Sequence, residues 1–336
     1  MKLNSRAMFL CLSVLTLALT VINIFFGAVD LPASEVVEAF AGGENDSIVR
    51  YIVMENRIPQ TFTSMLGGAA LAVCGLMLQT AFRNPLAGPS ILGISSGASL
   101  GVALVMLAMG GSVAVAGSLI AGYSAIIAGA VAGAMIITGI LTAISLRVHN
   151  NLLLLIVGIM TGYLTSSVVT LLSSLSSAES LQNYVMWGTG SFANVSLRQL
   201  PWFAGLVMCG LLAAILMAKP LNILLLGDSY ARNLGVRVER VKTGLLVVTG
   251  LLTAVTTAFC GPVSFIGLAM PHVARLLFRT DNHWILIPAS MITGAILAMT
   301  CNVLSVMPLN RVIPINALTP IAGVPVILYV VLSRQR

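Results

Sequence analysis

The sequence predicts an all-α membrane protein with about ten transmembrane helices. Charged residues make up only 8% of the 336 residues, whereas an average soluble domain contains about 25%. Hydrophobic residues make up 58% of the chain, and they gather in blocks long enough to cross a bilayer, which takes about 20 residues. Lys and Arg concentrate in alternate connections between these blocks, as the positive-inside rule describes.

The apolar blocks follow one another along the whole chain, so we expect one polytopic domain over residues 1–336. In order they cover residues 7–29, 60–81, 91–110, 115–145, 152–175, 200–217, 241–259, 262–278, 285–304 and 314–332. The first could be a signal peptide, but its apolar core is long and no A-x-A cleavage site follows it. The fourth is longer than a span needs, so we expect it to tilt or to end outside the bilayer.

The charges predict an orientation in which both termini are cytoplasmic. With the N-terminus inside, thirteen of the seventeen Lys and Arg residues fall on the inner side, and only Arg50, Arg57, Arg198 and Arg311 fall outside. Most carboxylates fall on the outer side, many of them in the 30–57 loop. The basic composition therefore reports membrane orientation and does not require nucleic acid as a partner.

The sequence lacks the residues that several classes of protein need for their function. The five cysteines sit far apart in apolar blocks and the three histidines are scattered, so no metal site is expected. No Asp or Glu falls inside the ten blocks, which argues against the main alternative, an ion-coupled secondary transporter. The chain also lacks a G-x-x-x-x-G-K-[ST] loop, so any ATP that drives it must be bound and hydrolysed by a partner.

The stretch "AFRNPLAGPSILGISSGASLG", residues 81–101, is unusually small and polar for this chain. Its two prolines predict an inner loop between the second and third spans. Gly93, Gly97 and Gly101 then recur every four residues, which predicts a smooth stripe for close helix packing. Three serines lie beside that stripe, and they either support packing or form one wall of a polar passage: Ser95, Ser96 and Ser99.

A second row of small polar residues runs along the fifth span. Gly162, Ser166, Thr170 and Ser173 fall within about 80° of one another on a helix, and Ser177 continues the row. Their hydroxyls can bond back to the helix, so they cost little in lipid. A continuous row is nevertheless better explained by a water-filled path or by a seam between helices.

The inner loop of residues 219–242 is too long for a minimal connection between two helices. Asp228 is a suitable N-cap for a short helix that ends near Asn233, and Gly235 is a suitable C-cap. Such a helix suits docking of a soluble partner, although a basic loop held near anionic lipid is the alternative. Farther along, Gly261, Pro262 and Pro271 predict a span between residues 259 and 278 that is broken twice.

Three motifs resemble those of the permease subunits of bacterial ATP-binding-cassette (ABC) importers for iron-siderophores, haem and vitamin B12, the FecCD type. They are "GGAALAVCGLMLQTAFRNPLAGPSILGISSGASLG", "LGDSYARNLGV" and "GPVSFIGLAMPHVARLL". The resemblance covers nearly the whole chain and implies a type II ABC importer architecture in the inner membrane. It also implies a homodimer that binds two cytoplasmic ATPase subunits, which bind ATP and Mg, and a periplasmic or lipid-anchored binding protein. The chain itself would be neither an enzyme nor a cofactor protein.

The resemblance also assigns roles to particular residues. The second motif would seat in the ATPase, through Leu226, Gly227, Asp228, Ala231, Arg232, Leu234 and Gly235. The fifth span would line the translocation path, and Asn150 and Asn151 would form an inner gate. Two outer segments depart from the family pattern, Arg57-Ile58-Pro59-Gln60 and Val312-Ile313-Pro314-Ile315-Asn316.

Arg57 and Arg311 are expected on the outer face at the starts of spans. Because prolines nearby fix their position, we expect them to pair with carboxylates of the binding protein, with anchoring to lipid headgroups as the alternative. The resemblance leaves the ligand open among ferric siderophores, haem and cobalamin.

Overall fold

The computed structural model describes residues 5–41, 48–108, 121–147, 151–306 and 312–333. Every regular element within these ranges is a helix. In chain order they are α1 (Ser5–Phe25), α2 (Ala33–Ala41), α3 (Ile48–Tyr51), the π-helical η1 (Ile52–Arg57), α4 (Ile58–Phe82), α5 (Ile94–Ala103), the π-helical η2 (Leu104–Ala108), α6 (Ala121–Arg147), α7 (Asn151–Leu175), α8 (Ala178–Gly188), the 3-10 turn η3 (Phe192–Asn194), α9 (Leu200–Leu216), α10 (Ala218–Leu225), α11 (Asp228–Asn233), α12 (Val238–Cys260), α13 (Ile266–Phe278), α14 (His283–Val306) and α15 (Ile315–Ser333).

Each predicted apolar block overlaps one of these helices. Six of the described helices are long and apolar enough to cross a membrane, and the number is seven if α9 and α10, which bend by 47°, form one span. Three further apolar helices are shorter: α5 with η2, α13, and α15. The prediction of an all-helical protein with several membrane-spanning helices is therefore confirmed, whereas the number of ten spans stays a prediction.

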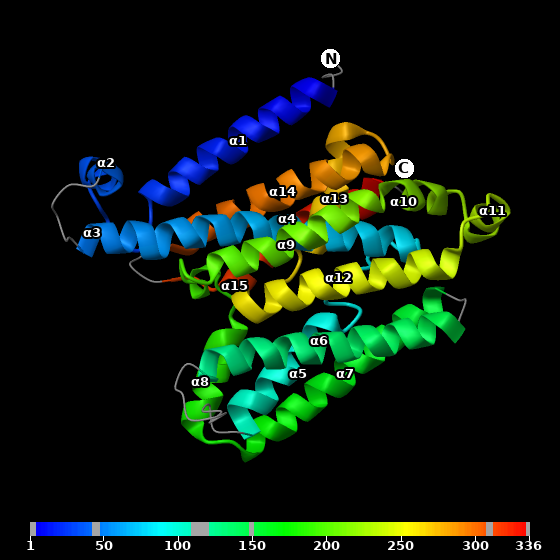
Figure 1. Cartoon of the computed structure of the whole chain (residues 1–336), viewed down its shortest axis with the longest axis horizontal. Helices are drawn as coiled ribbons and strands as arrows, with labels where there is room; N and C mark the ends of the chain where they lie inside the picture. Colours follow the sequence, from blue (N-terminus) through cyan, green and yellow to red (C-terminus); the bar gives the residue numbers. More distant parts are fainter. Residues whose placement is uncertain (1–4, 42–47, 109–120, 148–150, 307–311, 334–336) are drawn as a thin grey trace.

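Helix α4 is the centre of the bundle (Figure 1), and 83% of its most apolar stretch is buried. Helices α9, α12, α13 and α14 pack around it, and α1 lies against α14. Helices α5, α6, α7 and α8 form a second group, which joins the first where α5 and α6 contact α12. Residues from both groups pack into one continuous core.

Glycines allow the helix backbones to approach closely at several crossings. A Cβ atom on Gly75 of α4 would lie 1.6 Å from the carbonyl oxygen of Gly267 in α13. In α5, a Cβ on Gly101 would lie 1.9 Å from a carbonyl oxygen of α6. The small-residue stripe of α5 is therefore a surface for close helix packing, as its glycine spacing predicts.

Two helices begin inside the body of the protein. Helix α5 with η2 has 15 residues and α13 has 13, which give lengths of about 20 Å, short of the roughly 30 Å of a hydrocarbon core. Residues 88–91 line a pocket with Leu71, eleven residues before the end of α4, which is about 16 Å along the helix. The loop predicted on the inner face thus folds back into the bundle.

The second predicted break within residues 259–278 is wrong. The chain is irregular between Gly261 and Phe265, but Pro271 lies inside the continuous helix α13. A proline removes the hydrogen bond to the carbonyl four residues earlier, here that of Gly267. Because that carbonyl lies against Gly75 of α4, tight packing holds the helix together across the proline.

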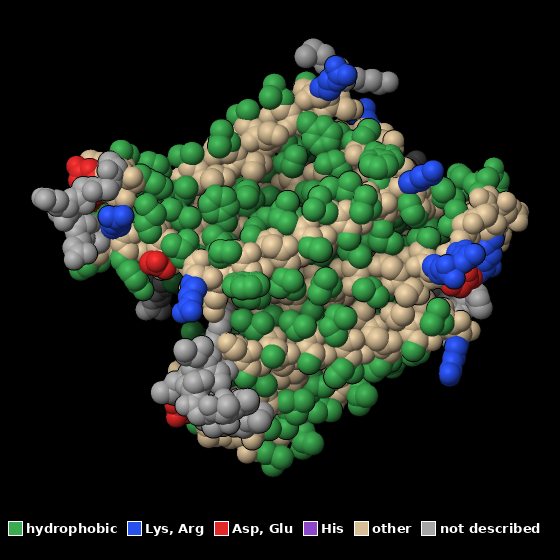
Figure 2. Space-filling view, in the orientation of Figure 1, with side chains coloured by type: hydrophobic (Ala, Val, Ile, Leu, Met, Phe, Trp, Pro, Cys, Tyr) green, Lys and Arg blue, Asp and Glu red, His purple; other side chains and the backbone are tan. Residues whose placement is uncertain are grey.

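The polar elements lie at the two ends of the bundle. Helix α11 lies at one end, toward which α1 begins and α15 ends, whereas α2, α3 and α8 lie at the opposite end (Figure 1). Blue Lys and Arg side chains gather near α11, and a broad apolar belt covers the surface between the two ends (Figure 2).

Candidate functional site

A cavity of about 380 Å³ lies where α5, α7 and α8 meet the two irregular segments. Most of its wall carries hydroxyl groups. The lining residues are Ser90, Ser95, Ser96, Ser99, Ser166, Val169, Thr170, Tyr184, Pro262 and Ser264. None of these ten residues is charged, so this wall offers hydrogen bonds without a fixed charge.

The cavity brings together most of the residues predicted for a polar path. The three serines of α5 face Ser166 and Thr170 of α7 across it. Gly162 instead packs against Gly93, and Ser173 is half-buried on α7 outside the lining. The structure thus supports both interpretations of α5, because its glycines pack and its serines line a cavity. Transport through it remains a prediction.

Some hydroxyls of the wall already bond to their own helix. The Oγ1 of Thr170 donates to the carbonyl of Ser166 at 3.0 Å, so its lone pairs remain for the cavity. On the opposite side, burial raises the pKa of Tyr184, while a hydrogen bond with Ser99 acts against that rise. The phenol therefore stays protonated at neutral pH and can donate.

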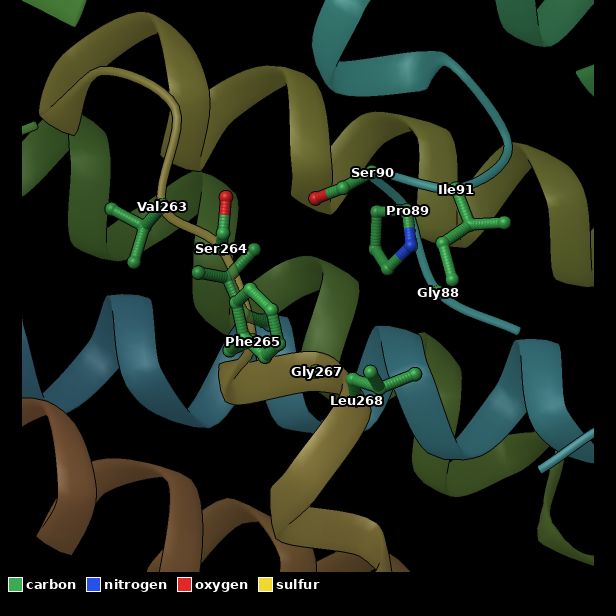
Figure 3. Close-up of a pocket in the computed structure, with 10 residues that line it drawn as sticks. Gly88, Pro89, Ser90, Ile91, Val263, Ser264, Phe265, Gly267 and Leu268 are labelled. Carbon is green, nitrogen blue, oxygen red and sulfur yellow. The ribbon is translucent and has the colours of Figure 1, made fainter. Parts of the chain in front are cut away.

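A smaller pocket of about 160 Å³ adjoins the cavity and shares Ser90 and Ser264 with it. Figure 3 shows these two serines on the two irregular segments, above a floor that includes Phe265 and Leu268. The sequence analysis missed Ser90, Ser264 and Tyr184. The signal for the two serines was available, since Ser90 directly follows one Gly-Pro pair and Ser264 lies two residues after another.

One amide side chain holds the second irregular segment in place. The Nδ2 of Asn316 donates to the carbonyls of Gly188 and Pro262, the former at 3.1 Å, and its Oδ1 accepts from the backbone N–H of Ser264 at 3.2 Å. Asn316 thereby satisfies backbone groups that the break leaves free at the edge of the cavity. Its position is one of those at which the sequence departs from the family pattern.

The short helix predicted within residues 219–242 is confirmed as α11, over Asp228–Asn233. Gly235 has a φ of 80°, and its N–H bonds to the carbonyl of Arg232, while the N–H of Val236 bonds to that of Ala231. This pair of bonds is a Schellman motif, which explains the need for glycine.

The expected N-cap is wrong, because Gly227 occupies that position and Asp228 is the first helical residue. The carboxylate of Asp228 instead binds two cations. Its Oδ1 lies 3.3 Å from Arg83, which follows α4, and its Oδ2 lies 2.5 Å from Lys242 of α12. Two cationic partners outcompete backbone capping for this carboxylate. The pairs tie α11 to both neighbouring helices.

The predicted contacts of this segment with a partner need one correction. Ala231 is fully buried within the chain itself, so its side chain is not free to enter a groove of another protein. Three large apolar side chains of this segment are exposed beside its polar ones: Leu226 is 62% exposed and Leu234 is 55% exposed, with Tyr230 similarly exposed between them. Arg232 is half-exposed and pairs with Glu239 at 2.6 Å.

Arg57 does not face the exterior, so its predicted role in docking is wrong. Its side chain is 3% exposed, and its Nη1 donates to the carbonyls of Ile24 and Phe25 at 3.0 and 2.6 Å. Its Nη2 donates to the carbonyl of Val29. Arg57 therefore caps the end of α1, where the last helical carbonyls lack partners.

The predicted inner gate and the second predicted docking residue fall wholly or partly outside the described residues. Arg311 and Asn150 lie outside the described residues. Asn151 begins α7, and its side chain is likewise outside the description. Their proposed roles in docking and in an inner gate remain predictions.

Comparisons with known proteins give one consistent result. The model of the FecCD transport family matches residues 15–333. The hemin transport system permease protein HmuU of Yersinia pestis is 35% identical over 290 residues, which cover 85% of this chain and 84% of the relative. The vitamin B12 import system permease protein BtuC of Klebsiella pneumoniae is 32% identical over 336 residues, covering 99% and 96%.

A solved structure has the same fold. It is described as a metal-chelate type ABC transporter in an inward-facing conformation, and it superimposes with a TM-score of 0.84 at 26% identity. The match covers 98% of this chain and 99% of the other.

Proposed function

Because the chain belongs to the FecCD transport family, we propose that it is the permease subunit of an ATP-driven importer in the bacterial inner membrane. Its ligand would be an iron chelate, such as a siderophore or haem, or cobalamin. The family match over residues 15–333 is the observation that carries the proposal. The haem and vitamin B12 permeases among its relatives support this class of ligand.

The proposal includes ten transmembrane spans with both termini in the cytoplasm, as in a type II importer. Six long helices, the bent pair and three shorter apolar helices are available for these spans. The cluster of Lys and Arg near α11 supports a cytoplasmic location for that end (Figure 2).

The hydroxyl-lined cavity is the proposed part of the translocation path. A wall with hydrogen-bonding groups and no charge can contact a large polar chelate without holding it tightly, which suits passage by alternating access. The ligand would reach this path from a periplasmic or lipid-anchored binding protein docked at the end that carries α2, α3 and α8.

The energy would enter at α11. Leu226, Tyr230 and Leu234 form an exposed apolar patch on a segment held rigidly by the two ion pairs of Asp228. Such a patch fits a soluble protein partner, here one of two ATPase subunits that bind and hydrolyse ATP with Mg. The permease itself would catalyse no reaction.

A second copy of the chain is the proposed partner within the membrane. Helix α7 exposes large apolar side chains, among them Tyr163, Leu164 and Leu171, each at least 60% exposed. Pairing through α7 would close the cavity wall formed by the same helix around a two-fold axis.

An ion-coupled secondary transporter is not favoured, because the cavity wall holds no carboxylate. The deciding experiment is uptake into proteoliposomes that contain the permease with its ATPase and binding protein. Radiolabelled cyanocobalamin, haemin and ferrichrome would be offered with and without internal MgATP. Accumulation of one of them only with ATP supports the proposal, whereas accumulation driven by a proton gradient without ATP would refute it.

A further inference from the structure

A buried chain of polar side chains connects α10, α14 and α4 at the inner end of the bundle. Asn222 Oδ1 lies 2.8 Å from Nδ1 of His283, and Nε2 of His283 lies 2.8 Å from Oγ1 of Thr80. His283 is 1% exposed and Thr80 is 5% exposed. The contact between His283 and Thr80 is therefore shielded from solvent, whereas Asn222 is half-buried.

The hydrogen-bond pattern fixes the direction of each bond. The backbone N–H of His283 donates to Asn222 at 2.8 Å, so the accepting atom of Asn222 is its oxygen. The Nδ2 of Asn222 donates to Oδ1 of Asn282, which also accepts from the backbone N–H of Trp284. Nδ1 of neutral His283 consequently carries the proton, and the one hydroxyl hydrogen of Thr80 is shared between Nε2 at 2.8 Å and the carbonyl of Leu76 at 2.9 Å.

A second link joins the same elements one turn farther along. Arg83, directly after α4, donates to the carbonyl of Leu224 in α10 and to Asp228 in α11, both at 3.3 Å. The end of α4 is therefore tied to the α10–α11 segment at two places, through Thr80 and through Arg83. Beyond Arg83 the chain enters the irregular segment that carries Ser90 at the cavity.

We propose that Asn222, His283 and Thr80 form a relay that transmits displacement of the α10–α11 segment to α4. The inference rests on the proposed function, because an ATPase must first move α11. At a donor–acceptor distance of 2.8 Å, a separation of about 1 Å breaks a hydrogen bond, so α4 follows α10 or loses the contact. The three residues are positioning residues, since none of them lines the cavity.

Transport coupling distinguishes a relay from a contact that only stabilises the fold. A purely structural contact would change the amount of folded complex, and uptake and ATP hydrolysis would fall together. A relay would change the amount of ligand transported for each ATP hydrolysed. The ratio of the two rates is therefore the measurement.

Thr80→Val is the test variant, because it removes the hydroxyl and keeps the shape of the side chain. Thr293→Val is the matched control, since Thr293 is also buried and, like Thr80, donates to the carbonyl four residues earlier in its own helix, at 2.9 Å in both cases. Thr80 differs by its contact with His283 of another helix. Both would be compared with wild type in the proteoliposomes described above, with whichever of cyanocobalamin, haemin or ferrichrome the wild type accumulates. We expect Thr80→Val to lower uptake per ATP about ten-fold, the effect of one unsatisfied buried group, and Thr293→Val by less than about two-fold.

Asn222→Ala provides a second, independent test. Because either substitution interrupts the same relay, the double variant Thr80→Val/Asn222→Ala should lose no more coupling than the worse single variant. Additive losses would refute the relay, as would equal effects of Thr80→Val and Thr293→Val or a parallel fall of uptake and hydrolysis. Wild-type protein that shows no ATP-dependent uptake would refute the proposed function before any variant is measured, and the relay with it.

Discussion

Replacing Arg57 by methionine tests whether this arginine caps α1 or serves the surface. The substitution keeps a long apolar stem and removes the donors to the carbonyls of Ile24, Phe25 and Val29. Gly27 allows the close approach, because a Cβ there would lie 2.9 Å from Nε of Arg57. All three carbonyl bonds would be lost together.

The expected cost follows from the number of bonds. Three hydrogen bonds at roughly 1 to 1.5 kcal/mol each give about 3–4 kcal/mol. For a chain of 336 residues this corresponds to a decrease in Tm of about 4–6 °C. Arg57→Lys should fall between wild type and Arg57→Met, because an ammonium can keep part of the bonding.

The assay is thermal unfolding of the purified permease in detergent, with Arg50→Met as the matched control. Arg50 is exposed on α3, so its loss should leave Tm within about 1 °C of wild type. Affinity for the binding protein would be measured below the unfolding range. An unchanged Tm for Arg57→Met together with weaker binding would refute the capping role and restore docking.

Three further predictions follow from orientation and packing. Single cysteines at Ser34 and Ser229, both exposed, should react with an impermeant maleimide on intact cells only at Ser34; the reverse pattern would invert the topology. Gly75→Ala should abolish folded protein, because its Cβ would meet a carbonyl oxygen of α13 at 1.6 Å, whereas Gly205→Ala, with open space around it, should fold normally; equal yields would refute the packing argument. Ala231→Trp should lower Tm because the position is fully buried in this chain, while Ser229→Trp on the same helix should not; a normal Tm for Ala231→Trp would contradict that burial.

The sequence predicted those features that depend on local chemistry. Helix α11 could be placed because a glycine at its end signals a left-handed residue, which Gly235 adopts. The glycine stripe of α5 could be placed because spacing by four defines one face of a helix. The polar residues of α5 and α7 could be chosen for the same reason, and five of the seven proposed for the path line one cavity.

The features that the sequence did not predict depend on tertiary direction. Arg57 lies where the charge pattern suggested an outer surface, but its side chain turns toward the end of α1, which is 32 residues away in sequence. A small side chain such as that of Ala231 suits both a contact with a partner and a position in the core. The sequence therefore could not tell which of the two applies. The depth of residues 88–91 depends on packing against α4, and two prolines alone predict only that a helix ends.

The polar side chains buried near the two irregular segments have a common physical cause. A broken helix inside a membrane leaves backbone groups that lipid cannot satisfy. His272 bonds to the carbonyl of Pro85 and Asn316 donates to that of Pro262, both within the irregular segments, and Gln79 donates to the carbonyl of Leu268 in the first turn of α13. Each of these side chains belongs to a different segment from the carbonyl that it contacts. The hydrogen bonds near the breaks therefore also hold neighbouring helices together.

This arrangement explains how the cavity can be polar without charge. The uncharged amide of Asn316 satisfies backbone groups of the second break, and the uncharged side chains of Ser90 and Ser264 line the cavity beside the two breaks. Cations instead gather at the end of the bundle that carries α11, where Arg83 and Lys242 pair with Asp228. The groups that pair with Asp228 and those that line the cavity are thus separate, and the first irregular segment joins them, since Arg83 and Ser90 lie seven residues apart.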